Sequence, residues 1–156
     1  MTDWSADLEL IRQAAIDAGA LALAEREAGL KIEAKPGGSP VTSGDLKVDA
    51  LLRERLLGAR PDYGWLSEET ADSPERLSRR RIFVVDPIDG TSNFARGLPH
   101  FAVSIALLQA GDPVVAALHC LPEDVAYTAV RGLGARRAGR RLAVPARRLD
   151  AGSVLG

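Results

Sequence analysis

The hydrophobic pattern of the chain changes at about residue 60, and this change limits the folds that the chain can adopt. Before it, apolar residues recur at helical spacing in two segments, from about 4 to 28 and from about 45 to 60. After it, the apolar segments are short and separated by turn residues, as in strands; they cover 64–67, 81–85, 102–108, 114–121 and 125–130. Further expected elements are a short strand over 30–34, a loop over 36–40 and a tight connection over 132–139. Two helices followed by strands predict an α+β fold, with the helices packed on a mainly antiparallel sheet.

Composition places the chain among globular proteins with one domain. Its 156 residues, of which 46% are hydrophobic, are enough for a single core, so we expect one domain over 1–156. The formal net charge of -1 indicates neither a nucleic-acid partner nor a membrane-surface protein. The segment 131–148 holds seven arginines, which we interpret as a solvated hairpin face, with a nucleic-acid- or anion-binding patch as the alternative.

The cysteine count and the N-terminus indicate where such a chain resides. Cys120 is the only cysteine, so the chain forms no internal disulfide. The N-terminus lacks the basic start and apolar stretch of a signal peptide. No apolar run is long enough to span a bilayer. We therefore expect a cytoplasmic protein.

Two carboxylates follow the apolar strand over 81–85, and they carry most of the chemical information. Asp86 and Asp89 are separated by Pro87, which stiffens the chain, and by Ile88, whose carbonyl is a further oxygen donor. Two acids held close repel each other unless a cation lies between them. Because magnesium prefers oxygen ligands, this segment predicts a magnesium site. The alternative is a simple turn whose acids cap the loop.

The residues that follow have the properties of a phosphate site. Gly90 and Thr91 stand where a helix can begin, and backbone N–H groups at a helix start attract anions. Glycine allows close approach of the backbone, and the Thr91 hydroxyl could hold an attacking water. Metal and phosphate binding are thus predicted side by side.

Acids in two other segments could join this site. Glu68 and Glu69 follow the short strand over 64–67, and Asp45 stands close to Thr42 in a loop before the second helix. Each has a simpler explanation, since paired glutamates are usually exposed and Asp45 could be a helix N-cap. Acids at the ends of different strands can nevertheless meet in space, as a site with several magnesium ions requires.

These motifs together resemble the inositol monophosphatase family of magnesium-dependent phosphatases. Residues 86–94 look like the signature loop of that family, and 67–70 and 41–45 look like its companion motifs in the right order. The likeness continues over 97–104 and 132–135. It implies the N-terminal half of the family's layered sugar-phosphatase fold. The family's α/β half, with a further metal-binding Asp in a Trp-Asp context, is expected to be absent from this sequence.

The resemblance implies metal ligands by position. Glu68, Asp86 and the Ile88 carbonyl would hold a first Mg²⁺, and Asp86 and Asp89 would share a second, in a site of two or three ions. Ser67 departs from the glycine that many relatives carry before the paired glutamates. Lys35 is a possible charge partner of this site.

The resemblance also implies catalytic roles. Asp45 and Thr91 would orient the nucleophilic water, with Glu68 beside them, and the amides of Gly90 and Thr91 would bind the substrate phosphate. The implied reaction is in-line attack by a metal-activated water without a phosphoenzyme. Two histidines, His100 and His119, are interpreted as structural.

Several functions remain open at this point. The first is a phosphatase for a small phosphorylated alcohol such as inositol monophosphate, and the second is a 3'(2'),5'-bisphosphate nucleotidase with the same metal motifs. Aspartyl-phosphate phosphatases also place Asp after a buried strand, but their two acids lie one residue closer together. A third possibility is a catalytically incomplete chain that associates with another chain. The resemblance favours a homodimer, and no nucleic-acid or membrane partner is expected.

Overall fold

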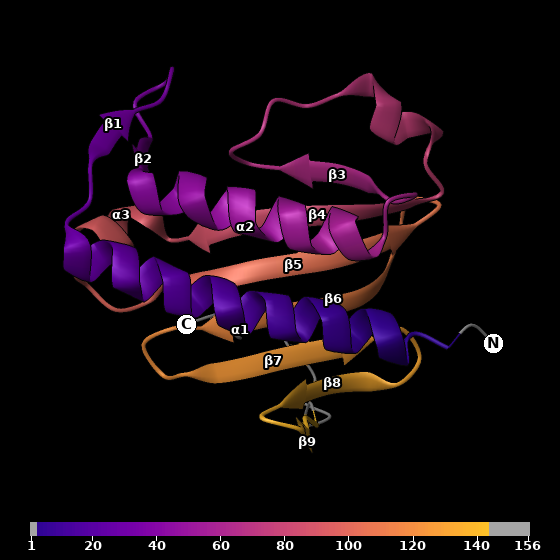
Figure 1. Ribbon diagram of the computed structural model, residues 1–156. Coiled ribbons are helices and arrows are strands. Elements are labelled where there is room, and N and C mark those ends of the chain that lie inside the picture. The colour runs from indigo at the N-terminus through magenta and orange to yellow at the C-terminus, as the bar shows by residue number, and fades with distance from the viewer. Residues whose placement is uncertain (1–2, 144–156) are drawn as a thin grey trace, which may run out of the picture.

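The structure, a computed structural model, describes residues 3–143 as two long helices against a seven-stranded sheet (Figure 1). The helices are α1 (Ser5–Ala28), α2 (Ser43–Ala59) and the short α3 (Thr91–Ala95), and a 3-10 turn, η1, covers Pro74–Ser78. The large sheet contains β3 (Gly64–Ser67), β4 (Arg81–Asp89), β5 (Ala102–Gln109), β6 (Asp112–Cys120), β7 (Val125–Val130), β8 (Gly134–Arg137) and β9 (Arg140–Arg141), in this spatial order. A separate hairpin pairs β1 (Ile32–Ala34) with β2 (Pro40–Thr42).

Strand directions in the sheet are antiparallel with one exception. All neighbouring pairs from β4 to β9 are antiparallel, whereas β3 runs parallel to β4 with Ser67 opposite Val85. A parallel pair needs a crossover connection rather than a tight turn. The segment that contains η1 provides this connection, and β3 and β4 therefore end at the same edge of the sheet.

Helices α1 and α2 lie side by side on one face of the sheet (Figure 1). The side of α1 that faces the core consists mostly of alanine, with Ile11 the largest of its fully buried residues. Small residues let the helix approach the sheet closely. At Gly19 a Cβ atom would lie 2.6 Å from the His119 Nδ1 atom, so a larger residue there would displace the His119 and Leu121 side chains.

The second face of the sheet is apolar but less covered. In β4, Phe83 and Val85 are buried beneath the helices, whereas Ile82 and Val84 alternate with them and are half-buried. Within residues 3–143, neither long helix packs on this second face. The described part of the chain thus presents a sheet with one face in the core and one partly open.

The expected α+β fold, with helices on a mainly antiparallel sheet, is confirmed. The strands over 64–67 and 125–130 have the predicted bounds, and the first strand of the acidic motif continues past 85 to Asp89. The 3-10 turn η1 was not predicted from the sequence. The expected loop over 36–40 is one residue shorter than predicted, because β2 begins at Pro40. The arginines up to Arg141 lie on or next to the exposed β8–β9 hairpin, as expected, and those beyond 143 lie outside the described residues. No helix in the described range is long and apolar enough to cross a membrane.

Candidate functional site

The parallel pairing of β3 and β4 brings two of the predicted acids to one edge of the sheet. Glu68 follows β3 directly, and its backbone N–H donates to the Val85 carbonyl at 3.3 Å. Val85 immediately precedes Asp86, so Glu68 and Asp86 are neighbours across the two strands. The register of a single parallel pair therefore decides this contact.

An irregularity in β4 changes the direction of the second acid. Asp86 lies opposite Ser104 and Asp89 opposite Ala102, so three steps along β4 correspond to two steps along β5. In a regular strand, residues three apart point to opposite faces of the sheet. One extra residue, a β-bulge, removes this alternation and allows both carboxylates to reach the same side.

The carboxylate of Asp86 is in an unfavourable environment without a cation. Its Oδ1 atom is buried and has no hydrogen-bond partner among the described residues. Burial raises the pKa of Asp86 to about 7, and the negative charges of Glu68 and Asp89 add to this effect. A buried oxygen with no partner that faces other acids fits a cation ligand, because a cation removes both the repulsion and the missing contact.

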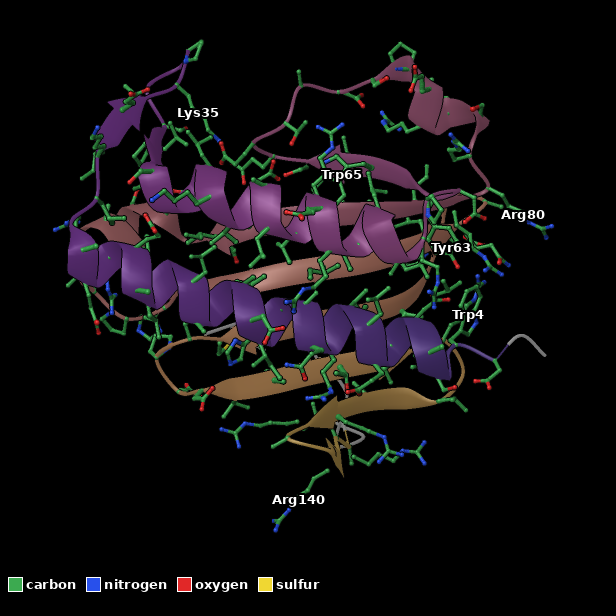
Figure 2. All side chains as sticks on the ribbon, in the orientation of Figure 1. Trp4, Lys35, Tyr63, Trp65, Arg80 and Arg140 are labelled. Atoms are coloured by element: carbon green, nitrogen blue, oxygen red, sulfur yellow. The ribbon has the colours of Figure 1, made fainter. Side chains whose placement is uncertain are left out.

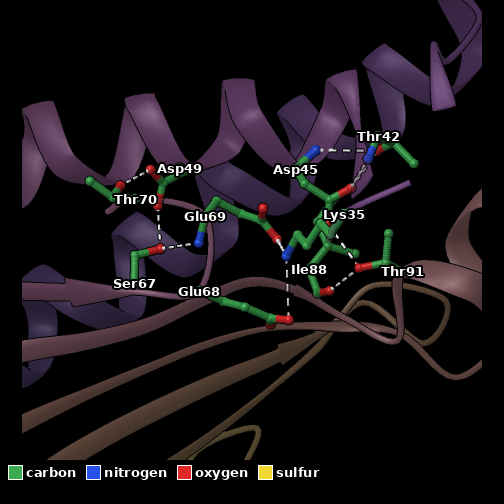
Figure 3. Close-up of polar contacts among 10 residues, drawn as sticks. All are labelled: Lys35, Thr42, Asp45, Asp49, Ser67, Glu68, Glu69, Thr70, Ile88 and Thr91. Atoms are coloured by element: carbon green, nitrogen blue, oxygen red, sulfur yellow. Dashed lines mark hydrogen bonds and ion pairs between the residues drawn. The ribbon is translucent and has the colours of Figure 1, made fainter. Parts of the chain in front are cut away.

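Asp45 connects the start of α2 to the loop after β4 (Figure 3). It is fully buried, and its Oδ2 atom accepts hydrogen bonds from the backbone N–H of Thr42, at 2.8 Å, and from the Thr42 hydroxyl. Its Oδ1 atom lies 2.9 Å from Thr91 Oγ1, which is also 2.9 Å from the Ile88 carbonyl oxygen. Thr42 is the N-cap and Asp45 the third helical residue of a capping box. Asp45 thus has a capping role and a contact with Thr91 at the same time.

Lys35 supplies positive charge from the β1–β2 hairpin, as predicted. Its Nζ atom lies 2.6 Å from Glu69 Oε1 and 3.5 Å from Glu68 Oε1. The Glu69 side chain is only 4% exposed, whereas that of Glu68 is 56% exposed and accessible to a ligand. Burial raises the pKa of Glu69, with the charges of Asp45 and Glu68 acting in the same direction and Lys35 against them.

The loop between β4 and α3 requires glycine at position 90. Gly90 has a φ of 85°, and a Cβ atom there would lie 2.6 Å from the His100 carbonyl oxygen. The same oxygen accepts a hydrogen bond from Asn93 Nδ2 at 3.1 Å. The predicted phosphate-binding residues Gly90 and Thr91 therefore stand at the start of α3. The His100 carbonyl restrains this loop through its close approach to Gly90 and its hydrogen bond with Asn93.

Not every predicted residue is already in a ligand arrangement. In the described part of the chain, no three acidic, histidine or cysteine side chains lie close enough to hold one ion. Asp89 is exposed, while Asp86 is half-buried. The predicted ligands share one edge of the sheet without forming a closed cage. Of the two histidines, His119 lies under α1 with its Nε2 atom 3.0 Å from Asp124 Oδ1, apart from these acids.

Sequence reasoning missed Asp49 of α2. Its carboxylate accepts hydrogen bonds from the hydroxyls of Ser67 and Thr70, which flank the paired glutamates (Figure 3). The available signal was the spacing, since Asp49 is four residues after Asp45 and so faces the same side of the helix.

Comparison with known proteins identifies the family of the chain. Residues 3–154 match the sequence model of the Inositol monophosphatase family. An inositol-1-monophosphatase of Rhizobium meliloti is 41% identical over 127 residues, which are 81% of this chain and 47% of the relative. A histidinol-phosphatase of Mycobacterium tuberculosis is 42% identical over 106 residues, 68% of this chain and 40% of that protein.

A solved structure shows the same fold. The extragenic suppressor protein SuhB of Bartonella henselae superposes with a TM-score of 0.84 at 36% identity, and the match covers 92% of this chain and 56% of the SuhB chain. The chain spans about half the length of the curated relatives it matches. The family match nevertheless extends over nearly the whole sequence, and so the chain belongs to the inositol monophosphatase family.

Proposed function

We propose that this chain forms the metal- and phosphate-binding part of a magnesium-dependent phosphomonoesterase that acts on a small phosphorylated alcohol. The observation that carries the proposal is the buried Asp86 oxygen, which has no hydrogen-bond partner within residues 3–143 and feels the charges of Glu68, Asp89 and Asp45. The names of the relatives, inositol-1-monophosphatase and histidinol-phosphatase, support a phosphatase reaction on a small molecule.

The donor set is suited to magnesium. Glu68, Asp86, Asp89 and the Ile88 carbonyl offer only oxygen atoms, which is the ligand type that Mg²⁺ prefers. In this proposal they hold two or three ions. Bound magnesium would neutralise phosphoryl charge and lower the pKa of the attacking water.

The protein's own contribution is to orient the water and receive its proton. The Thr91 hydroxyl has one hydrogen, and a bond to Asp45 leaves an oxygen lone pair that can accept a hydrogen bond from water. Thr42 holds the other oxygen of Asp45, so the Thr91 hydroxyl faces two acceptors, Asp45 Oδ1 and the Ile88 carbonyl, each at 2.9 Å. A proton from the water would pass to Thr91 while the Thr91 proton passes to Asp45. The amides of Gly90 and Thr91 would bind the phosphate for in-line attack.

A second candidate, a catalytically incomplete chain, is favoured by a specific observation. Among the described residues, the acids form no closed ligand cage. In that case the chain binds metal weakly and requires a partner chain. A homodimer in the cytoplasm is part of the proposal for either candidate.

The test is magnesium-dependent phosphate release by this chain, with an Asp89→Asn variant as control. The substrates are inositol monophosphate, histidinol phosphate and 3'-phosphoadenosine 5'-phosphate, and the last of these represents the bisphosphate nucleotidase alternative. Release that requires magnesium and disappears in the control supports the phosphatase, and the preferred substrate decides its class. No release, together with measurable magnesium binding, supports the incomplete chain. Absence of both release and binding contradicts both candidates.

A further inference from the structure

Asp49 is a buried carboxylate of α2 whose hydrogen bonds all go to hydroxyl groups near the paired glutamates. Its residue is 7% exposed, and no Lys, Arg or His within residues 3–143 forms an ion pair with it. A buried charge costs free energy unless hydrogen bonds compensate for the lost water. For Asp49 the compensation comes from two hydroxyl groups, those of Ser67 and Thr70.

These hydroxyls belong to a connected network around the paired glutamates. Ser67 Oγ donates to one Asp49 oxygen and accepts from the backbone N–H of Glu69 at 3.3 Å. Thr70 Oγ1 donates to the other Asp49 oxygen and lies 3.4 Å from the Trp65 Nε1 donor. Asp49 therefore holds the residues immediately before and after Glu68 and Glu69. Both of its carboxylate oxygens and both hydroxyl groups have hydrogen-bond partners.

The same helix holds the other half of the site. Asp45 lies one helical turn before Asp49, and about 6 Å separate the two positions along the axis. Asp45 contacts Thr91 at the start of α3, and Asp49 contacts Ser67 at the end of β3 and Thr70 in the loop that follows. In Figure 3 the two carboxylates point from α2 toward these two loops. One rigid element thus sets the relative position of the two loops that carry the acids.

We propose that Asp49 is a positioning residue that fixes Glu68 relative to Asp86 and Thr91. This inference deepens the proposed function and rests on it for the role of Glu68. Glu68 itself is 56% exposed in its side chain, and its backbone has one hydrogen bond to β4, at 3.3 Å. The Asp49 contacts on either side therefore supply much of the restraint on its position.

The variant Asp49→Asn tests this inference in the complete 156-residue chain. An amide keeps the size of the carboxylate but can accept from only one of the two hydroxyls through its oxygen. Hydrogen–deuterium exchange measures the protection of residues 66–71, and calorimetric titration with Mg²⁺ alone measures metal binding. We expect exchange in 66–71 to accelerate about tenfold and magnesium affinity to fall about tenfold, in the range known for groups that orient metal ligands.

Asp7→Asn is the matched control. Asp7 is a second buried acid on a helix, and it accepts from Arg60 Nε at 2.8 Å and from the Tyr63 hydroxyl. This cluster lies at the end of the molecule opposite Lys35 (Figure 2). The control should lower the melting temperature without altering exchange in 66–71 or magnesium affinity. A purely structural role of Asp49 would make the two variants behave alike.

Partner variants separate positioning from loss of folding. If Asp49→Asn does not fold, Thr70→Val removes one of the two hydroxyl contacts from the other side, and the same two measurements apply. In the folded double variant, the effects of Asp49→Asn and Thr70→Val should not add. Unchanged exchange in 66–71 overturns the inference. If the unaltered chain itself binds no Mg²⁺, the proposed function fails, and local exchange alone then decides whether Asp49 positions the loop.

Discussion

The environment of Asp86 predicts that removing a proposed metal ligand stabilises the metal-free protein. Burial, with the charges of Glu68 and Asp89, raises the Asp86 pKa from 3.8 to about 7. Between these two values the folded chain keeps a proton that the unfolded chain has lost. Stability from this group is therefore present at low pH and is lost as the pH rises from about 4 to about 7. Asp86→Asn removes the titration and should keep that stability at pH 8.

The size of the effect follows from the shift in pKa. A rise from 3.8 to about 7 corresponds to about 4 kcal/mol at about 1.36 kcal/mol per pKa unit. Asp86 is only half-buried, so solvent screening reduces this figure, and we expect about 1–2 kcal/mol. For a chain of this length that amounts to roughly 3–6 °C in melting temperature.

Thermal unfolding at pH 4, 6 and 8, with and without 10 mM Mg²⁺ as a roughly saturating dose, measures this prediction. Without metal, Asp86→Asn should melt higher than the unaltered chain at pH 8 and no higher at pH 4. With magnesium, the unaltered chain should gain stability at pH 8 and Asp86→Asn should not. The exposed acid Asp62 provides the control Asp62→Asn, which should follow the unaltered chain. Parallel pH curves for the unaltered chain and Asp86→Asn would refute the reasoning.

Three further substitutions test the framework of the site and the core by chemical denaturation. Thr42→Ala removes the N-cap of α2 and one contact of buried Asp45, and should cost about 1–2 kcal/mol. Gly90→Ala places a Cβ atom 2.6 Å from the His100 carbonyl at a positive φ, and should cost about 1–3 kcal/mol or displace the loop. Leu52→Ala opens a cavity at a fully buried position of α2 and should lower the free energy of unfolding by about 2–5 kcal/mol, and a smaller loss would mean that the core closes over the cavity.

The sequence predicted most elements because their signals are local. The helical spacing in α1 and α2 and the turn residues between β5, β6 and β7 act within a few residues of each other. The parallel direction of β3 was not predictable in this way, because it depends on the crossover through η1 and on packing beneath α2. The place of Pro40 in β2 was also not predicted, since two prolines and two glycines within 36–40 indicate a loop and only the pairing with β1 makes Pro40 part of a strand.

In the site, too, local signals were predictable and long-range contacts were not. Asp86 and Asp89 were evident from their position after an apolar run, but their convergence depends on a bulge that only the register with β5 reveals. Asp45 was considered either a cap or a site residue, and the structure gives it contacts of both kinds. Asp49 was missed because a single acid inside a helix looks solvated until the loop that covers it is placed. Long-range contacts therefore account for what the sequence did not predict.

The position of these contacts indicates that magnesium binding and catalytic turnover depend on different parts of the molecule. The two carboxylates of α2, Asp45 and Asp49, contact both acid-bearing loops, the one after β3 and the one after β4. The half-buried apolar face of β4, by contrast, belongs to the opposite side of the sheet from α2. A molecule bound at that face would leave the contacts of Asp45 and Asp49 in place. We therefore expect the chain without a partner to bind magnesium, and we expect this binding to depend on the contacts of α2.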